Sequence, residues 1–273
     1  KNFKWQNEFD RTKHFDLDWI RLSIYNLLVE YEAGSFTADH LEDWYNIHLW
    51  SFIDRSLDDL DRVAAIHGEP CSLTSAARKN RNRVVESVLS LVRKKIGRRG
   101  DLIIQRGECE FGVGDNGRKF DRENGSKLLR EHGLKLPKML KDIFIELSQV
   151  CQYEEAKIRN LQTLGFVHSG LYMMLLLLDQ PAGYICRVTR SKMEKVSEDV
   201  SQFPETLSVL TLILKAKMII KEIICLLEGR TPETNNKFIK RLQQAGCDDV
   251  LNTKHSIPPC NTTPVKKRRH NNK

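Results

Sequence analysis

Two carboxylates stand on a stretch of the sequence that has the pattern of a β-hairpin. Residues 101–111 carry apolar side chains on both sides of Arg106 and Gly107, which favours two antiparallel strands joined by a tight turn. With the turn centred on those two residues, Asp101 and Glu110 become diagonal neighbours whose Cβ atoms lie roughly 5.5 to 8 Å apart. At that separation they can share one divalent cation such as Mg²⁺, which binds carboxylate oxygens. The hairpin therefore predicts a metal site.

The two faces of the predicted hairpin differ in chemistry, because side chains alternate along a strand. One face is wholly apolar and is expected to enter the core; it carries Leu102, Ile104, Cys109, Phe111 and Val113. The opposite face carries Asp101, Glu108 and Glu110, and Glu108 is the poorer co-ligand because it lies two residue pairs further along. The alternative is an ordinary solvent-exposed face whose acids pair with Arg98 and Arg99.

Helices are expected on both sides of this hairpin. Apolar residues recur at three- and four-residue steps in residues 17–32, 37–60, 84–95, 122–131, 137–159 and 207–227. Strands are expected at 163–170, 171–178 and 183–190, with a turn at 179–183 joining the last two. This order predicts an α/β fold, with α+β as the alternative, in which a small mixed central sheet is flanked by helices.

The chain is expected to comprise three parts. Residues 1–35 form a helical N-terminal extension, residues 36–228 form the α/β core, and residues 229–273 form a polar, basic tail that is largely disordered after about residue 253. Because the chain begins at Lys1 rather than at methionine, a fragment of a longer protein is one of the open alternatives.

The composition is that of a globular protein, with 40% hydrophobic and 29% charged residues in 273. The most apolar segment, 207–227, contains Lys215, Lys217, Lys221 and Glu222, which argues against a membrane span. The seven cysteines are an odd number and include no CxxC pair. They argue against a disulfide framework and a structural zinc site, and they favour a reducing, intracellular compartment.

The net charge of +8 is concentrated in one segment. Residues 78–99 contain nine Lys or Arg side chains and one acid, Glu86. This concentration favours a phosphate-rich partner, most simply nucleic acid and DNA in particular, whereas the alternative is a solvated basic face. The candidate contact residues are Arg78, Lys79, Arg81, Arg83, Arg98 and Arg99. A second basic run, Lys-Lys-Arg-Arg at 266–269, is typical of a nuclear-import signal and predicts a nuclear location.

Two histidines and one glycine-rich stretch are expected to be structural. His67 and His168 have no partner at the spacing of metal ligands, so each is expected to be a hydrogen-bonded side chain of the fold. Residues 112–117 follow a predicted strand but lack the Lys-Ser/Thr ending of a phosphate-binding loop, and they are expected to form a flexible bend.

The sequence resembles the PD-(D/E)XK nuclease superfamily in its order of elements: a helix, a strand carrying Asp, a strand carrying Glu, a helix and further strands. Segments at 78–83, 97–104, 110–112 and 134–138 are also similar to fungal proteins, and the likeness covers roughly residues 40–228. The resemblance implies a restriction-endonuclease-like fold and metal ligation by Asp101 and Glu110. It also implies a further carboxylate from the preceding region, with Glu42 and Glu69 as candidates.

The chain departs from the family at one position. The family has a lysine two residues beyond the glutamate, thought to orient or activate the attacking water, and this chain has Gly112 there. One replacement is Lys119, which the hairpin geometry favours. Another is an acid in the segment Glu108-Cys-Glu110, and a third alternative is that the fold persists without hydrolysis.

These observations predict a nucleic-acid-binding, nuclease-like domain. If it is active, it is expected to hydrolyse phosphodiesters with Mg²⁺ or Mn²⁺, with Asp101, Glu110 and Glu69 as ligands and Lys119 as the catalytic lysine. The alternative is a non-catalytic interaction or effector-like protein built on the same scaffold.

Overall fold

The computed structural model describes residues 10–81, 83, 93–117 and 131–229. Its first part is helical: α1 (Arg11–Glu32), a 3₁₀ turn (Ser35–Thr37), α2 (Glu42–Tyr45), a π-helical turn (Asn46–Trp50) and α3 (Ser51–Ser56). The predicted helix at 17–32 is thus confirmed, and it ends two residues before Gly34. Gly34 has a φ of 68°, and this left-handed backbone conformation is common just after the end of a helix. The predicted helix at 37–60 is divided by the π-helical turn and begins only after Leu41.

A single mixed sheet forms the centre of the molecule. Its strands are β1 (Val63–His67), β2 (Leu102–Arg106), β3 (Cys109–Gly117), β4 (Gln162–Ser169), β5 (Tyr172–Ala182) and β6 (Ile185–Arg190), side by side in that order. A short strand β7 (Glu194–Lys195) also pairs with β5. Neighbouring strands are antiparallel except β3 and β4, which are parallel. The predicted fold class, a mixed sheet flanked by helices, is confirmed.

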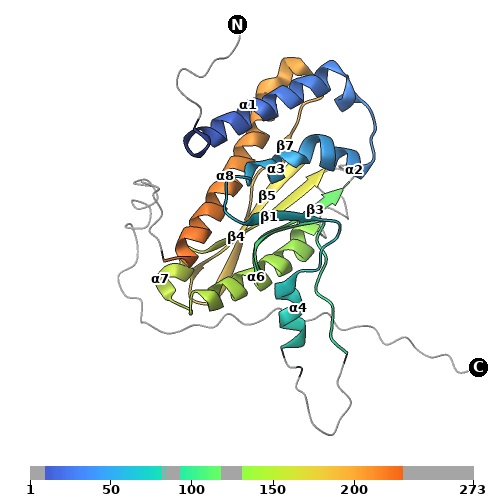
Figure 1. Ribbon diagram of the computed structural model, residues 1–273. Helices are drawn as coiled ribbons and strands as arrows, with labels where there is room; N and C mark the ends of the chain where they lie inside the picture. Colours follow the sequence, from blue (N-terminus) through green and yellow to red (C-terminus); the bar gives the residue numbers. More distant parts are fainter. Residues whose placement is uncertain (1–9, 82, 84–92, 118–130, 230–273) are drawn as a thin grey trace, which may run out of the picture.

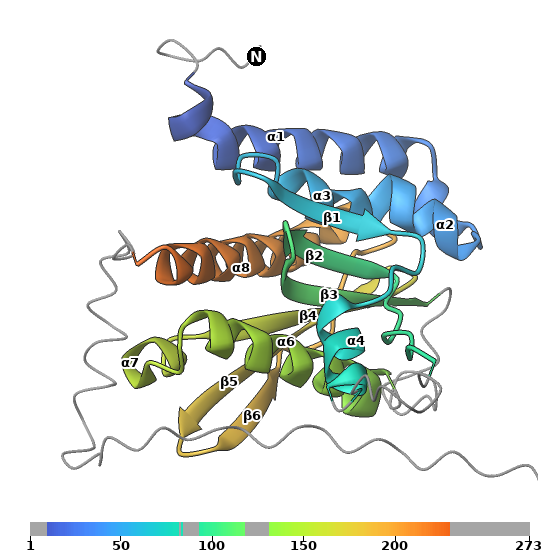
Figure 2. The same ribbon diagram turned by 60° about the horizontal axis from the view of Figure 1, so that its bottom comes forward.

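Helices cover both faces of the sheet (Figure 1). On one face α6 (Leu136–Val150) packs across β3, β4 and β5, and α4 (Leu73–Asn80) packs against α6. On the other face α8 (Phe203–Leu227) packs on β4 and β5 and contacts α3, which in turn contacts α1. Figure 2 shows the resulting layers, with α1 along one outer edge and α6 and the short helix α7 (Glu155–Ile158) on the opposite side.

The N-terminal helix belongs to the same core as the sheet. Trp19 and Leu27 of α1 are buried in the hydrophobic cluster that includes the strands, and the Trp19 indole donates a hydrogen bond to the Phe52 carbonyl at 3.0 Å. The Nζ of Lys217, which is 1% exposed in α8, forms ion pairs with Asp16 of α1 and with Asp59. The packing therefore shows no break at residue 35, where the sequence predicted a boundary.

Other predicted segments differ from the structure or lie outside it. β1 and α4 were not predicted, and residues 112–117, expected to form a bend, are the second half of β3. Gly112 suits this strand because a Cβ at that position would lie 2.6 Å from the Leu164 side chain of β4. Most of the predicted helices at 84–95 and 122–131, and the tail after 229, lie outside the described residues.

Within the described ranges, none of the helices is long and apolar enough to cross a membrane. The long helix α8, predicted as a buried core helix, places one apolar stripe against the sheet and carries the buried Lys217.

Candidate functional site

The β2–β3 hairpin exists, but its register differs from the predicted one. The turn is Gly107-Glu108, with Arg106 opposite Cys109, rather than Arg106-Gly107. Gly107 has a φ of 61°, and a two-residue hairpin turn favours such a residue at its first position. The register then shifts between Ile104 and Gln105, as in a β-bulge.

The combined shift moves the acids apart. Gln105 lies opposite Glu110, but beyond the irregularity Leu102 lies opposite Gly114. The predicted diagonal placement of Asp101 beside Glu110 is therefore wrong. By continuation of the ladder, Asp101 aligns with Asp115, which lies roughly 16 Å from Glu110 along β3 at about 3.3 Å per residue.

Glu110 has a structural role at the N-terminus of α4. Its side chain is buried and accepts hydrogen bonds from the Ser72 hydroxyl at 2.8 Å, the Leu73 N–H at 2.5 Å and the Thr74 hydroxyl at 2.6 Å. A carboxylate at a helix N-terminus satisfies backbone donors that lack a helical partner and interacts favourably with the helix dipole. The structure therefore does not bring Glu110 and Asp101 together as the ligands of one metal ion.

Asp101 instead lies against Asp115, at the end of the sheet. The Asn116 N–H donates to the Asp101 carboxylate at 2.6 Å, and the Asp101 N–H donates to the Gly114 carbonyl at 2.9 Å. One oxygen of Asp115 accepts a hydrogen bond from the Lys135 ammonium at 2.7 Å. The other oxygen, Oδ2, is buried and has no hydrogen-bond donor among the described residues.

The pKa of Asp115 is raised to about 7: burial raises it most, the Lys135 ammonium opposes the rise, and the neighbouring carboxyl of Asp101 adds to it. Two carboxylates in contact repel each other unless a proton or a cation lies between them. At neutral pH the carboxylates of Asp101 and Asp115 would therefore stabilise a cation bound between them.

Asp101 also lines a cleft of about 640 Å³ between α2, α3 and the end of the sheet. The acids that line it are Glu42, Asp43, Asp54, Glu69 and Asp101, and the remaining polar lining residues include Asn46, Arg55, His67 and Asn116. Two of the predicted metal-site carboxylates, Glu42 and Glu69, thus share this cleft with Asp101. Glu69 forms an exposed ion pair with Arg99 at 3.1 Å.

The two histidines that were expected to be structural lie near this cleft. His67, in its wall, contacts both carboxylate oxygens of Asp54 at 2.9 and 3.0 Å, and this hydrogen bonding raises the pKa of His67. His168, on β4, is buried with its ring 5.1 Å from that of Trp50. Burial lowers the pKa of His168 to about 3, so its imidazole stays neutral.

The described residues contain no group of three or more His, Cys, Asp or Glu side chains positioned to hold a metal ion together. Asp101 and Asp115 supply two carboxylates, and a cation there would complete its coordination with water or with substrate oxygens, as Mg²⁺ commonly does.

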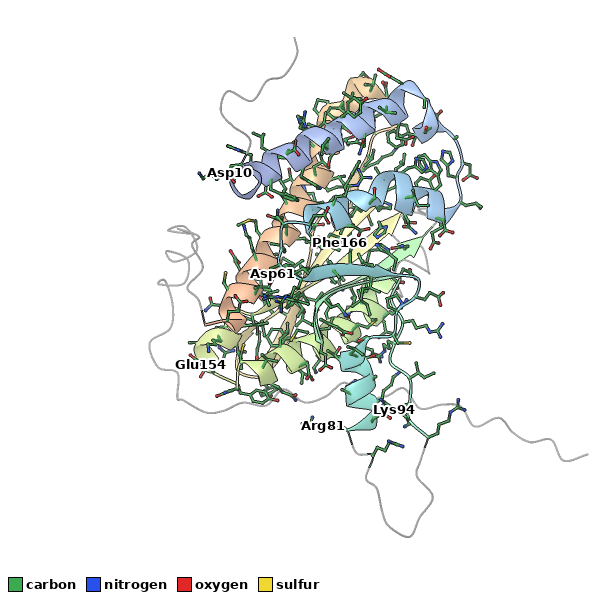
Figure 3. All side chains as sticks on the ribbon, in the orientation of Figure 1. Asp10, Asp61, Arg81, Lys94, Glu154 and Phe166 are labelled. Carbon is green, nitrogen blue, oxygen red and sulfur yellow. The ribbon has the colours of Figure 1, made fainter. Side chains whose placement is uncertain are left out.

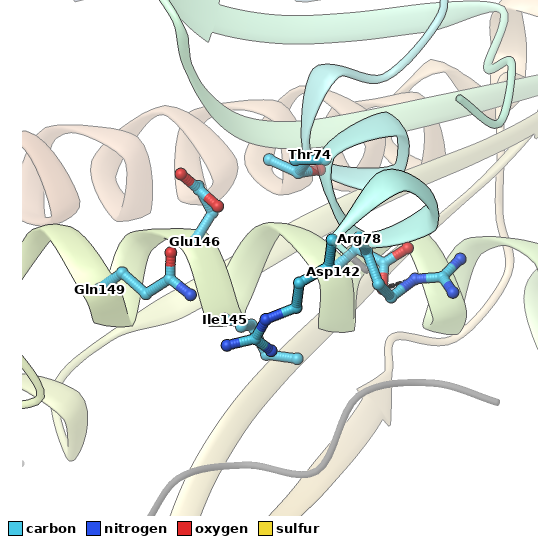
Figure 4. A pocket seen from close by; sticks show the side chains of 8 residues that line it. Thr74, Arg78, Asp142, Ile145, Glu146 and Gln149 are labelled. Carbon is cyan, nitrogen blue, oxygen red and sulfur yellow. Dashed lines mark ion pairs between the residues drawn. The ribbon is translucent and has the colours of Figure 1, made fainter. Parts of the chain in front are cut away.

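The basic segment divides into buried and exposed side chains. Arg78 and Arg98 both form ion pairs with the buried Asp142 of α6, at 2.7 and 3.2 Å. Figure 4 shows the first of these pairs beside a small pocket of about 120 Å³ between α4 and α6. Burial raises the pKa of Asp142, while Arg78 and Arg98 act in the opposite direction. These two arginines were predicted as nucleic-acid contacts. Arg78 joins α4 to α6, and Arg98 joins the segment before β2 to α6.

The other basic residues lie on the surface along α4, from Arg99 near its N-terminal side to Arg81 just after its C-terminus. Lys79 donates to the Ile96 carbonyl at 2.7 Å, and the Asn80 amide bonds the backbone N–H and carbonyl of Lys95, which fixes residues 93–99 alongside α4. Arg81 and Lys94 lie at the same end of the molecule (Figure 3). The exposed members of this basic surface are Arg81, Arg83, Arg93, Lys94, Lys95 and Arg99.

Lys119, the predicted catalytic lysine, lies outside the described residues. The lysine that contacts Asp115 is Lys135, which precedes α6 and lies outside the predicted set of site residues. Asp115 is also outside the predicted set, because the sequence predicts a bend at 112–117, whereas Asp115 lies in β3 across from Asp101.

Comparisons with protein-family models, with curated proteins and with solved structures found no match to this chain. The function must therefore be argued from the geometry of these residues.

Proposed function

We propose that this chain is a nucleic-acid-binding domain of the PD-(D/E)XK nuclease type, with Asp101 and Asp115 as the ligands of a divalent cation. The observation that carries this proposal is the contact of the two carboxylates beside the Lys135 ammonium, at the end of an antiparallel strand pair. DNA is the proposed substrate, and phosphodiester hydrolysis is the proposed reaction.

The order of elements supports the proposal. A helical region is followed by β2, which Asp101 precedes, by β3, which carries Asp115, by α6 and by further strands. That order is the one on which the resemblance to the nuclease superfamily rests. Asp115 takes the role predicted for Glu110, and Lys135 takes the role predicted for Lys119.

The donor set fits a hard cation. Both ligands are carboxylates, and the buried Oδ2 of Asp115 has no donor within the described part of the chain. Mg²⁺ and Mn²⁺ prefer such oxygen ligands. A cation bound there would lower the pKa of its bound water and stabilise negative charge on a phosphate.

Two groups of the protein act on the carboxylates of the proposed cation site. The Asn116 N–H fixes one oxygen of Asp101, and the Lys135 ammonium opposes the rise in the pKa of Asp115. The Lys135 side chain is partly buried, so it can reduce the rise in the pKa of Asp115 and also present positive charge to a phosphate at the cleft.

The basic surface leads to this site along the chain. Residues 93–99 run beside α4 and continue directly into Asp101. A nucleic-acid backbone held there would enter a cleft rich in carboxylates, where like charges repel. Binding close to Asp101 should therefore require a divalent cation, whereas contact with the basic surface should not.

A second candidate, a non-catalytic interaction protein on the same scaffold, is favoured by a different observation. Glu110 is engaged at α4, Gly112 replaces the expected lysine, and the described residues offer only two carboxylates at the pair. On this alternative the basic surface would bind nucleic acid without hydrolysis.

Nicking of supercoiled plasmid DNA with Mg²⁺ or Mn²⁺ separates the two candidates. The wild type is expected to nick the plasmid, and Asp101→Asn and Asp115→Asn should each lower the rate by about 100-fold. Asp61→Asn, at an exposed acid paired with Arg106, is the matched control and should keep the wild-type rate. A wild type that is inactive with both metals would leave only the non-catalytic candidate, and full activity of Asp101→Asn would remove the assigned site.

The binding claim has its own test. Reversing Arg81 and Lys94 to Glu should reduce the slope of log affinity against log salt by about 0.9 for each phosphate that the variant no longer neutralises. Lys192→Glu, at an exposed lysine between β6 and β7, is the control and should leave the slope unchanged. An equal slope for the Arg81 and Lys94 variant would exclude the basic surface from the contact.

A further inference from the structure

A histidine–aspartate pair lies in the wall of the cleft beside the proposed cation site. The Nε2 atom of His67 lies 3.0 and 2.9 Å from the two carboxylate oxygens of Asp54. Both side chains line the cleft of about 640 Å³ that Asp101 also lines. The proposed function uses neither of them, although a histidine held by a carboxylate is an arrangement that enzymes use to transfer protons.

The sheet places this histidine close to Asp101. His67 is the last residue of β1, and its partner on β2 is Leu102, the residue that follows Asp101. Paired residues of antiparallel strands lie about 5 Å apart and consecutive residues about 3.8 Å apart, so the Cα atoms of His67 and Asp101 are separated by roughly 6 Å. The imidazole can therefore reach a phosphate that is bound at Asp101.

The two ring nitrogens of His67 have different surroundings. A carboxylate only accepts hydrogen bonds, so Nε2–H donates to Asp54. Within the described ranges, Nδ1 of His67 has no hydrogen-bond partner, and 42% of the side chain is exposed. Asp54 thus holds the ring by one nitrogen and leaves the other nitrogen for a substrate.

The surroundings of His67 also favour its charged form. The hydrogen bond to Asp54 raises the pKa of His67, burial acts in the opposite direction, and the charges of Asp54 and Asp101 raise it. At neutral pH the imidazolium is therefore more populated than it is for a free histidine, and its Nδ1–H is then a proton donor. The other charged groups that line the cleft are Glu42, Asp43, Arg55 and Glu69.

A second histidine–carboxylate pair shows what is particular to this one. The Nδ1 atom of His48 lies 2.8 Å from a carboxylate oxygen of Glu30, and the His48 side chain is 43% exposed. Neither residue of that pair lines the cleft. Exposed pairs of this kind contribute little to stability, so both histidines can be replaced without unfolding the protein. The two pairs share chemistry and exposure, and they differ in their position relative to Asp101.

We propose that His67 is the general acid of the proposed phosphodiester hydrolysis, with Asp54 as its positioning residue. This inference rests on the proposed function. The attacking water gives one proton to the solvent, and its oxygen forms the new bond to phosphorus. The bond between phosphorus and the leaving oxygen breaks, and that oxygen takes the Nδ1 proton of the His67 imidazolium. The neutral imidazole then regains a proton from the solvent.

Replacement of one leaving oxygen by sulfur in a short DNA duplex tests this role. The bond that the wild type cleaves is first identified from the ends of its products. A thiolate leaves without taking up a proton, so cleavage of a P–S bond needs no general acid. His67→Gln can still donate to Asp54 but cannot supply a proton. It should cleave the oxygen duplex about 100-fold more slowly than the wild type, and the sulfur duplex within about twofold of the wild-type rate.

Two further variants separate this inference from the proposed function. His48→Gln is the matched control and should cleave both duplexes at the wild-type rate. Asp101→Asn should lose rate on both, because the cation serves both reactions. If His67→Gln lost the same factor on the two duplexes, or lost none on either, the general acid would be wrong and the proposed function would stand. A wild type that cleaves neither duplex would overturn both.

The pH dependence of cleavage tests the positioning role of Asp54. The rate on the oxygen duplex should fall as pH rises through the pKa of His67, because the imidazolium then loses the proton that it donates. Asp54→Asn removes the charge that raises this pKa, so the fall should begin at lower pH. His48→Gln should leave the profile unchanged. An unchanged profile for Asp54→Asn would exclude Asp54 from this role.

Discussion

The Ser72 hydroxyl donates a hydrogen bond to the carboxylate of Glu110, 2.8 Å away and 38 positions later in the sequence. Because the Leu73 N–H and the Thr74 hydroxyl donate to the same carboxylate, Glu110 fixes the start of α4 to β3. Glu110, which was predicted as a metal ligand, therefore has a structural role.

Glu110→Gln is therefore expected to lower the free energy of unfolding by about 1–3 kcal/mol, because buried donors lose a charged acceptor. Glu108→Gln, at the exposed position of the same hairpin turn, should change it by less than about 0.5 kcal/mol. Urea unfolding measures both values. Equal stability of the two variants would contradict the structural role of Glu110.

Asp115 is expected to make stability depend on pH. Its pKa in the folded protein is about 7, against 3.8 for the free side chain, so folding favours its protonated form. The stability associated with that proton is present below about pH 4 and is lost as pH rises through about 7. Asp115→Asn should therefore gain stability relative to the wild type between about pH 5 and pH 8, as measured by urea unfolding. A constant difference between the two proteins over that range would contradict the raised pKa.

The same variant reports on cation binding. At about pH 8, Mg²⁺ or Mn²⁺ should raise the Tm of the wild type because the cation binds only the folded state, and it should leave the Tm of Asp115→Asn unchanged. Thermal unfolding with and without metal measures the shift. An equal rise in both proteins would place the cation elsewhere.

His168 should make stability depend on pH in the opposite direction to Asp115. Burial lowers its pKa to about 3 from the usual 6.5, so the unfolded chain takes up the proton first. The stability of the neutral imidazole is present above about pH 6.5 and is lost as pH falls toward about 3. His168→Gln should therefore lose less stability than the wild type between about pH 7 and pH 5, as measured by urea unfolding. If both proteins lost the same stability between those pH values, protonation of His168 would not account for the pH dependence.

Gly97 lies where the basic segment passes the N-terminus of α4. A Cβ on Gly97 would stand 2.2 Å from the Ser72 carbonyl oxygen, which no real contact allows. Gly97→Ala should destabilise the protein by about 1–3 kcal/mol. Gly133→Ala, where a Cβ would meet nothing within 4 Å, is the control and should be neutral or slightly stabilising. Similar Tm values for both variants would contradict the close approach.

The long and strongly periodic elements could be predicted from the sequence. The 207–227 helix, the 163–170 strand and the helix after Pro137 correspond to α8, β4 and α6. β1 and α4 were missed because the first is only five residues long and the second owes its start to Ser72 and to the distant Glu110. Local patterns do not carry that information.

The candidate site could be predicted only in part. The sequence located the hairpin and Asp101, but one residue of turn placement and one bulge decide which acid faces Asp101. The glycine at position 107 was the available signal, since a residue with a φ of 61° suits the first position of the turn. Arg78 and Arg98 could not be separated from the exposed bases, because their partner Asp142 lies far away in the sequence, on α6.

The buried Lys217 has a consequence for any shortened version of this protein. Its ammonium is neutralised by Asp16 from the first helix and by Asp59, and it lies 4.2 Å from the centre of the Phe15 ring. A chain trimmed at residue 35 would leave that charge with half of its counterions and remove Trp19 and Leu27 from the hydrophobic core. Such a fragment would be prone to aggregate, so expression and crystallisation should begin upstream of Asp10, with the first helix treated as part of the folding unit.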